Sequence, residues 1–136
     1  MRTMGVVRVA AIGLLLASGG AALAADDGTV KVAKSPQHGD YLTDGKGMAL
    51  YFFLKDSKGK SACTGQCVVA WPLFQAEKVT PQGEGLKAAD FATISREDGQ
   101  TQTTYQGKPL YYYVKDQKPG DTTGHGVKDV WILATP

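Results

Sequence analysis

The sequence predicts an all-β domain made of two four-stranded antiparallel units that pack as a compact sandwich or barrel-like body. Two observations support this prediction. The phrase LYFFLKD at 50–56 returns as LYYYVKD at 110–116. Short runs of β-branched and aromatic residues, separated by turn-forming residues, recur along the rest of the chain.

The repeat extends well beyond this phrase. Aligning 47–73 with 107–133 without a gap gives eight identities, which are Gly47/Gly107, Leu50/Leu110, Tyr51/Tyr111, Lys55/Lys115, Asp56/Asp116, Lys58/Lys118, Trp71/Trp131 and Leu73/Leu133. Conservative exchanges fill the aromatic centre, at Phe52/Tyr112, Phe53/Tyr113 and Leu54/Val114. One supersecondary unit is therefore expected to occur twice.

Each unit is expected to contain four strands. The first has candidate strands at 29–33, 40–43, 48–54 and 68–74, with a tight-turn signal at 44–47. The second has them at 91–95, 101–105, 109–114 and 130–134, with turns at 97–100 and 106–108. The polar stretch 75–90 contains Pro81, Gly83 and Gly85, which predicts a surface connection with at most one helical turn near 86–90.

The N-terminus has the features of a signal for export. Arg2 and Arg8 precede or flank the apolar run VAAIGLLLA, and small residues follow up to ALA at 22–24. We expect a signal peptide at 1–24, cleaved near Ala24, and a single β domain at 25–136. Its repeats lie at about 29–74 and 91–134 and are joined by the linker 75–90.

The expected location is therefore the bacterial periplasm or the exterior, with no stable membrane span after cleavage. An uncleaved anchor is the alternative, although this apolar run is short for about 30 Å of hydrocarbon. Removing Arg2 and Arg8 takes the 15 basic residues to 13, which equals the 13 acidic residues. A neutral mature chain argues against nucleic acid as a partner.

The aromatic phrases carry a family resemblance. A Tyr-x-(Phe/Trp/Tyr)-x-x-Asp pattern is met twice, by Tyr51, Phe53 and Asp56 and by Tyr111, Tyr113 and Asp116. Together with CTGQCVVAWP at 63–72, YQGKPLYYY at 105–113 and GDTTGHGV at 120–127, it resembles a family of predicted secreted bacterial lipoproteins described as a secreted repeat of unknown function. The resemblance spans about 39–134 and implies no particular activity.

The chain departs from many members of that family in two ways. It lacks a cysteine that could be lipidated near the cleavage point, and Leu73 stands where a second proline often follows Trp-Pro. Both departures put membrane tethering through a lipid in doubt.

Cys63 and Cys67 form the pattern C-x-x-x-C, for which we weigh three interpretations. The leading one is a structural disulfide, because the periplasm is oxidising. A thiolate pair for a soft metal such as Cu(I) and a redox-active pair are the alternatives. Haem attachment is excluded, because C-x-x-C-H is absent. His125 is a weak further candidate for a metal ligand, and His38 a weaker one.

The motif residues are expected to be mainly scaffold. Trp71 and Trp131 are predicted to occupy equivalent places in the core. The Tyr51 face and its copy in the second repeat are expected to be buried, and a cleft between the repeats is the alternative and the best place for a ligand. Asp56 and Asp116 would accept hydrogen bonds from loop N–H groups.

No catalytic motif can be assembled at a meaningful spacing, so we expect no enzyme activity and no cofactor. The leading hypothesis is a non-catalytic binding or interaction module whose partner is an envelope protein or a small ligand. The alternative is a periplasmic redox or copper-type metal-handling protein that uses the loop of Cys63 and Cys67.

Overall fold

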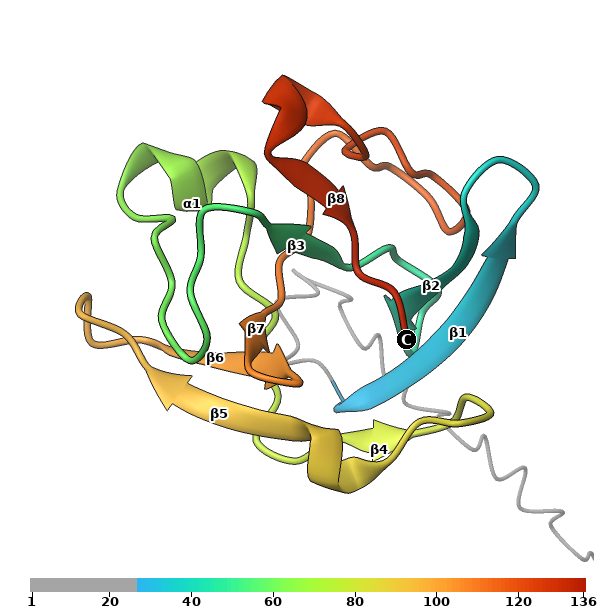
Figure 1. Ribbon diagram of the computed structural model, residues 1–136, viewed down its shortest axis with the longest axis horizontal. Coiled ribbons are helices and arrows are strands. Elements are labelled where there is room, and N and C mark those ends of the chain that lie inside the picture. Colours follow the sequence, from blue (N-terminus) through green and yellow to red (C-terminus); the bar gives the residue numbers. More distant parts are fainter. Residues whose placement is uncertain (1–26) are drawn as a thin grey trace, which may run out of the picture.

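The computed structural model describes residues 27–136, so the expected signal peptide and its cleavage site lie outside the described residues (Figure 1). The all-β prediction with two repeats is confirmed. The elements, in chain order, are β1 (Thr29–Ser35), β2 (Gly39–Asp44), β3 (Tyr51–Phe53), α1 (Gln66–Ala70), β4 (Thr80–Pro81), η1 (Ala88–Asp90), β5 (Phe91–Ser95), β6 (Thr101–Tyr105), β7 (Lys108–Pro109), η2 (Val127–Asp129) and β8 (Trp131–Leu133).

The strands form three small sheets, with no closed barrel in the described part of the chain. Each repeat begins with an antiparallel hairpin, which is β1 and β2 in the first repeat and β5 and β6 in the second. Strand β7 adds to β6, and β4 from the linker pairs in parallel with β1. The linker therefore contributes a strand that its polar composition did not predict, while η1 falls within the expected helical turn near 86–90.

The aromatic strands are shorter than expected because the chain changes its pairing partner at their start. The N–H groups of Leu50 and Leu110 still donate to their own hairpins, at Leu42 and Thr103. One residue later, Tyr51 and Tyr111 exchange both backbone hydrogen bonds with each other, at 2.8 and 3.1 Å. The two repeats thus meet at this tyrosine pair.

From this point each aromatic strand pairs with the end of the other repeat. Strand β3 is antiparallel to β8, with Tyr51 opposite Leu133. The copy of this contact is an isolated bridge between Tyr111 and Leu73. Figure 1 shows β3 near the middle of the molecule, with β8 beside it. The repeats are therefore interlocked by backbone pairing.

The expected strand at 68–74 is wrong in its first half, where the chain forms α1 instead. The disulfide between Cys63 and Cys67 keeps the chain before it from being extended, because its Cα atoms are 5.3 Å apart, whereas four residues of extended strand span about 13 Å. Helix α1 begins within this closed loop, at Gln66, and continues to Ala70. Pro72 then ends the helix, because the residue before a proline is forced out of the helical region. Trp71 accordingly has φ −124° and ψ 76°.

Strand β3 separates two layers of core, because alternate residues point to opposite faces. Leu50 and Phe52 join a cluster with the hairpin residues Val30 and Leu42. On the other face, Tyr51 joins the second cluster, which also contains Ala49, Cys63, Trp71, Tyr111, Trp131 and Leu133. Within residues 27–136, no helix has the length and apolar character needed to cross a membrane.

Candidate functional site

The tyrosines and aspartates of the repeated motif are hydrogen-bonded across the two repeats. The hydroxyl of Tyr51 donates to Asp116 Oδ2 at 2.6 Å, and the hydroxyl of Tyr111 donates to Asp56 Oδ2 at 2.7 Å. Asp116 Oδ1 also accepts hydrogen bonds from the N–H and the hydroxyl of Thr123. Each repeat therefore donates one of these tyrosine–aspartate hydrogen bonds to the other repeat and accepts one from it.

The aromatic rings of the motif are crossed in the same way. The indole rings of Trp71 and Trp131 stack with centroids 3.7 Å apart. Phe53 stacks on Trp131 at 4.2 Å, and Tyr113 stacks on Trp71 at 4.0 Å. Four rings in the order 53, 131, 71 and 113 thus form one column, with each tryptophan covered by an aromatic ring from the other repeat.

Burial governs the electrostatics of this cluster. Tyr51 and Tyr111 are 0% exposed. Burial is the main cause that raises the pKa of Tyr51 and of Tyr111, and their hydrogen bonds to Asp116 and Asp56 raise it further. Burial also raises the pKa of Asp56, against the lowering effect of the Ala62 N–H. Both hydroxyls therefore remain protonated donors at neutral pH, which suits them to hold the repeats together.

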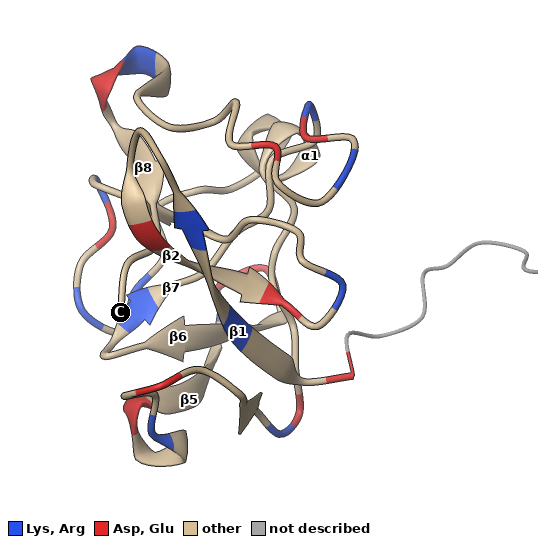
Figure 2. Cartoon of the chain, turned by 90° about the vertical axis from the view of Figure 1, so that its right-hand side faces the viewer, with Lys and Arg blue, Asp and Glu red and all other residues tan. Residues whose placement is uncertain are grey.

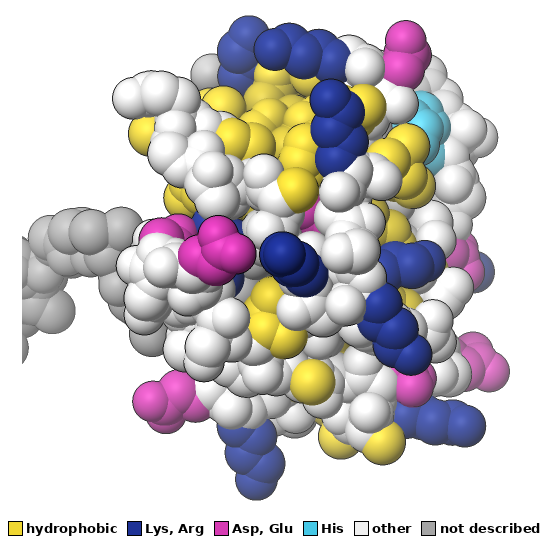
Figure 3. Space-filling model, turned by 60° about the vertical axis from the view of Figure 1, so that its left-hand side comes forward, with side chains coloured by type: hydrophobic (Ala, Val, Ile, Leu, Met, Phe, Trp, Pro, Cys, Tyr) yellow, Lys and Arg dark blue, Asp and Glu magenta, His cyan; other side chains and the backbone are white. Residues whose placement is uncertain are grey.

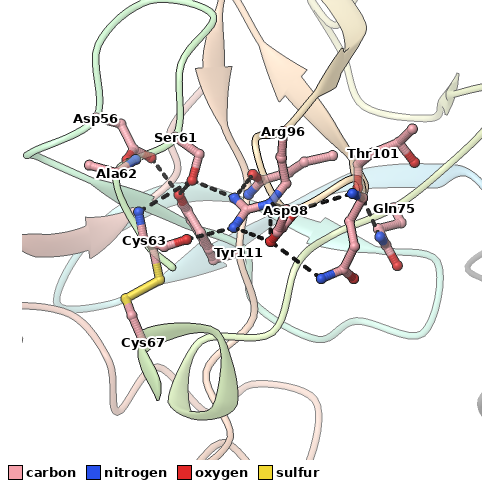
Figure 4. Close-up of polar contacts among 12 residues, drawn as sticks. Asp56, Ser61, Ala62, Cys63, Cys67, Gln75, Arg96, Asp98, Thr101 and Tyr111 are labelled. Atoms are coloured by element: carbon pink, nitrogen blue, oxygen red, sulfur yellow. Dashed lines mark hydrogen bonds and ion pairs between the residues drawn. A yellow bond between two sulfur atoms is a disulfide. The ribbon is translucent and has the colours of Figure 1, made fainter. Parts of the chain in front are cut away.

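The disulfide loop is fixed by a buried arginine that sequence reasoning missed. Figure 4 shows Arg96 reaching from the end of the β5–β6 hairpin towards this loop, where it donates to Cys63 O at 2.6 Å and to Ser61 Oγ at 2.5 Å. Asp98 forms an ion pair with Arg96 at 2.9 Å. Ser61 Oγ lies 2.6 Å from the Tyr111 hydroxyl, so the loop is tied to the motif cluster.

Cys63 and Cys67 form the expected disulfide. The pair therefore carries no free thiolate in this structure. Cys63 is completely buried and Cys67 is half-buried.

After the expected signal peptide, position 96 carries the one arginine among many lysines. This was the signal in the sequence that could have pointed to the contact between Arg96 and the disulfide loop.

The two histidines of the chain, His38 and His125, lie against each other near β8. Their ring centroids are 4.3 Å apart, although His38 lies in the β1–β2 turn and His125 precedes η2. The Nδ1 atom of His125 accepts the Leu133 N–H at 3.0 Å, so in the neutral ring Nε2 carries the proton. Within residues 27–136, no three His, Cys, Asp or Glu side chains gather as a metal site.

A pocket of about 330 Å³ opens beside β3, at the junction of the two repeats. Strand β3 and the loop after it come from the first repeat, and β7 and β8 from the second. The apolar lining residues are Phe52, Phe53, Leu54, Pro109 and Ile132, and the polar ones are Asp56, Ser57, Lys58, Gln106 and Lys108. An apolar wall with a few polar groups is typical of small-molecule sites.

The surface around these elements mixes apolar and charged side chains. Leu54 in the pocket wall is 55% exposed, and Val69 and Val114 are exposed as well. Figure 2 shows both signs of charge scattered over loops and strand ends. In Figure 3, hydrophobic side chains gather on the upper part of the face shown, bordered and crossed by Lys or Arg side chains.

The structure thus brings together some candidates and separates others. Tyr51, Tyr111 and Asp116 are buried beside both tryptophans, and the half-buried Asp56 is hydrogen-bonded to them through Tyr111. Asp56 and Phe53 also line the pocket. His125 contacts His38 and β8. No sequence motif predicted that Lys58 and Lys108 line the pocket or that the Tyr112 hydroxyl donates a hydrogen bond to Asp44.

A family model described as a secreted repeat of unknown function matches residues 31–75 and 92–135. These two matches cover both repeats and most of the described chain. No curated protein and no solved structure matches the chain.

Proposed function

We propose that this chain, which belongs to the family of secreted repeats of unknown function, acts as a non-catalytic binding module in the bacterial periplasm or outside the cell. We place cleavage of the signal peptide near Ala24, as its sequence predicts. The ligand of the binding module is a small molecule that occupies the pocket beside Phe52.

The position of the pocket carries this proposal. It lies where the two repeats meet, and its walls are backbone segments held by hydrogen bonds. The N–H of Leu54 donates to Val130 O at 2.7 Å, and β3 pairs with β8 along Ile132. A pocket with such fixed walls loses little conformational entropy when a ligand enters.

The use of the polar side chains supports a binding role over catalysis. The acids and hydroxyls of the motif bind one another, as in the pairs of Tyr51 with Asp116 and of Tyr111 with Asp56. Arg96 is engaged with the disulfide loop. A catalytic acid or base must reach a substrate atom. Tyr51, Tyr111 and Asp116 are buried, and the pocket residue Asp56 has both carboxylate oxygens in hydrogen bonds within the protein.

The alternative is redox or copper-type metal handling through Cys63 and Cys67. It requires the thiolate form, whereas the two sulfur atoms are bonded to each other. It also gains nothing from His125, whose Nε2 lone pair would become available only if the proton moved to Nδ1 and faced the Leu133 N–H. Elemental analysis and a free-thiol count of protein purified from the periplasm would decide this point.

The binding proposal is tested with three probes of one chain length, 1-octanol, octanoate and octylammonium. Each is titrated into isotope-labelled protein while amide NMR shifts are followed. We expect saturable shifts for at least one probe at Leu54, Lys108 and Ile132. Leu54→Trp should abolish them by filling the pocket, whereas Val114→Trp, the same change at the equivalent position of the other repeat, should not. If no probe gives saturable shifts at these residues, the proposed function is wrong.

A further inference from the structure

We infer that the ligand of this pocket is an amphipathic anion, with its apolar body against Phe52, Leu54 and Ile132 and its negative group between Lys58 and Lys108. This inference rests on the proposed binding function and names the chemistry of the ligand. A medium-chain carboxylate is the simplest member of this class. The pocket volume of about 330 Å³ suits a ligand of that size.

Two lysines place positive charge at the pocket. Lys108 Nζ lies 4.8 Å from the centroid of the Phe52 ring, so the cation sits directly over the apolar floor. The stem of Lys58 packs closely on Gly107, where an added Cβ would come within 2.5 Å of Lys58 Cγ. Neither lysine forms a salt bridge with any residue in 27–136.

The second repeat provides an internal comparison for Lys58, because the equivalent lysine is neutralised within the protein. Lys118, the copy of Lys58, forms an ion pair with Asp121 at 3.0 Å. Lys58 has no acid in the place that Asp121 takes beside Lys118, because no residue in 27–136 forms a salt bridge with it. An external anion would supply the missing negative charge.

One acid does line the pocket, and its contacts direct it away from a ligand. Asp56 accepts the Ala62 N–H through Oδ1 at 2.6 Å and the Tyr111 hydroxyl through Oδ2 at 2.7 Å. Figure 4 shows both contacts on the side of the disulfide loop. With this carboxylate held by the protein, the two lysines set the charge preference of the open part of the pocket.

The three octyl probes separate this inference from the binding function. We expect octanoate to bind about five- to twentyfold more tightly than 1-octanol, since each solvent-exposed ion pair contributes about two- to fivefold, and octylammonium to bind most weakly. About 1 M salt, where the Debye length is about 3 Å, should remove most of the preference for octanoate.

Substitutions assign the preference to the two lysines. Lys58→Met and Lys108→Met keep most of the aliphatic stem, and each should weaken octanoate binding about two- to fivefold while leaving 1-octanol unchanged. Lys118→Met is the matched control in the second repeat and should change neither affinity. Equal affinities for octanoate and 1-octanol would overturn the anion inference while leaving the binding function in place. Persistence of the anion preference in the Lys58→Met/Lys108→Met double variant would overturn it as well.

Discussion

The crossed tyrosine–aspartate pairs allow a test of how the two repeats are joined. In the structure the Tyr51 hydroxyl donates a hydrogen bond to Asp116 of the other repeat and none to Asp56 of its own repeat. A double-mutant cycle with Tyr51→Phe and Asp116→Ala should therefore give a large coupling free energy. The parallel cycle with Tyr51→Phe and Asp56→Ala should give a coupling close to zero.

The magnitude follows from the contacts. A hydrogen bond to a charged acceptor contributes about 1.5–3 kcal/mol, and the Tyr51–Asp116 distance is 2.6 Å with both side chains buried. The same hydroxyl accepts the N–H of buried Gly124 at 3.1 Å, and Tyr51→Phe leaves that donor unpaired. We expect Tyr51→Phe to lower the free energy of unfolding by about 2–4 kcal/mol, with about 1.5–3 kcal/mol of this as coupling to Asp116.

Urea unfolding followed by tryptophan fluorescence measures these free energies, because Trp71 and Trp131 lie beside the tyrosine pair. The Tyr111→Phe cycle is the symmetric control and should couple to Asp56. A coupling of Tyr51 to Asp56 as large as that to Asp116 would refute the crossed arrangement. So would an unfolding free energy that does not change in either single variant.

Three further measurements address other parts of the structure. Trp71→Ala should cost about 3–5 kcal/mol of unfolding free energy as a large core deletion, because the ring is stacked on both faces, and a loss below about 1 kcal/mol would contradict its place in the core. The Cys63→Ala/Cys67→Ala variant should lose about 2 kcal/mol in chemical denaturation, since the disulfide closes a very short loop, and mass spectrometry of the unreduced native protein should find no alkylatable cysteine. Because burial and then the neighbouring His38 lower the pKa of His125, the unfolded chain takes up the proton first, so the unfolding free energy should fall as the pH drops below about 6.5. His125→Asn, which keeps an acceptor for the Leu133 N–H, should reduce that dependence, and an unchanged pH profile would exclude His125 as its source.

Features that depend on neighbouring residues could be predicted from the sequence. Alternating aromatic and β-branched residues favour strands wherever they occur, so both hairpins were predicted within about two residues of their ends. The duplicated phrase was visible because the aligned identities keep a constant spacing. The disulfide between Cys63 and Cys67 followed from the expected oxidising compartment, although its effect on the chain between them was missed.

The tertiary structure decides which repeat supplies the aspartate that accepts the hydrogen bond of each motif tyrosine. Because the two motifs are nearly identical, the sequence offers Tyr51 two interchangeable aspartates, at 56 and at 116. One physical clue was present, since residues five apart point to opposite faces of an extended strand, which makes contact between Tyr51 and Asp56 difficult. The backbone exchange between Tyr51 and Tyr111 then brings Asp116 within reach. The pocket arises from the same interlocking, because its walls come from segments about fifty to eighty residues apart whose proximity depends on long-range pairing.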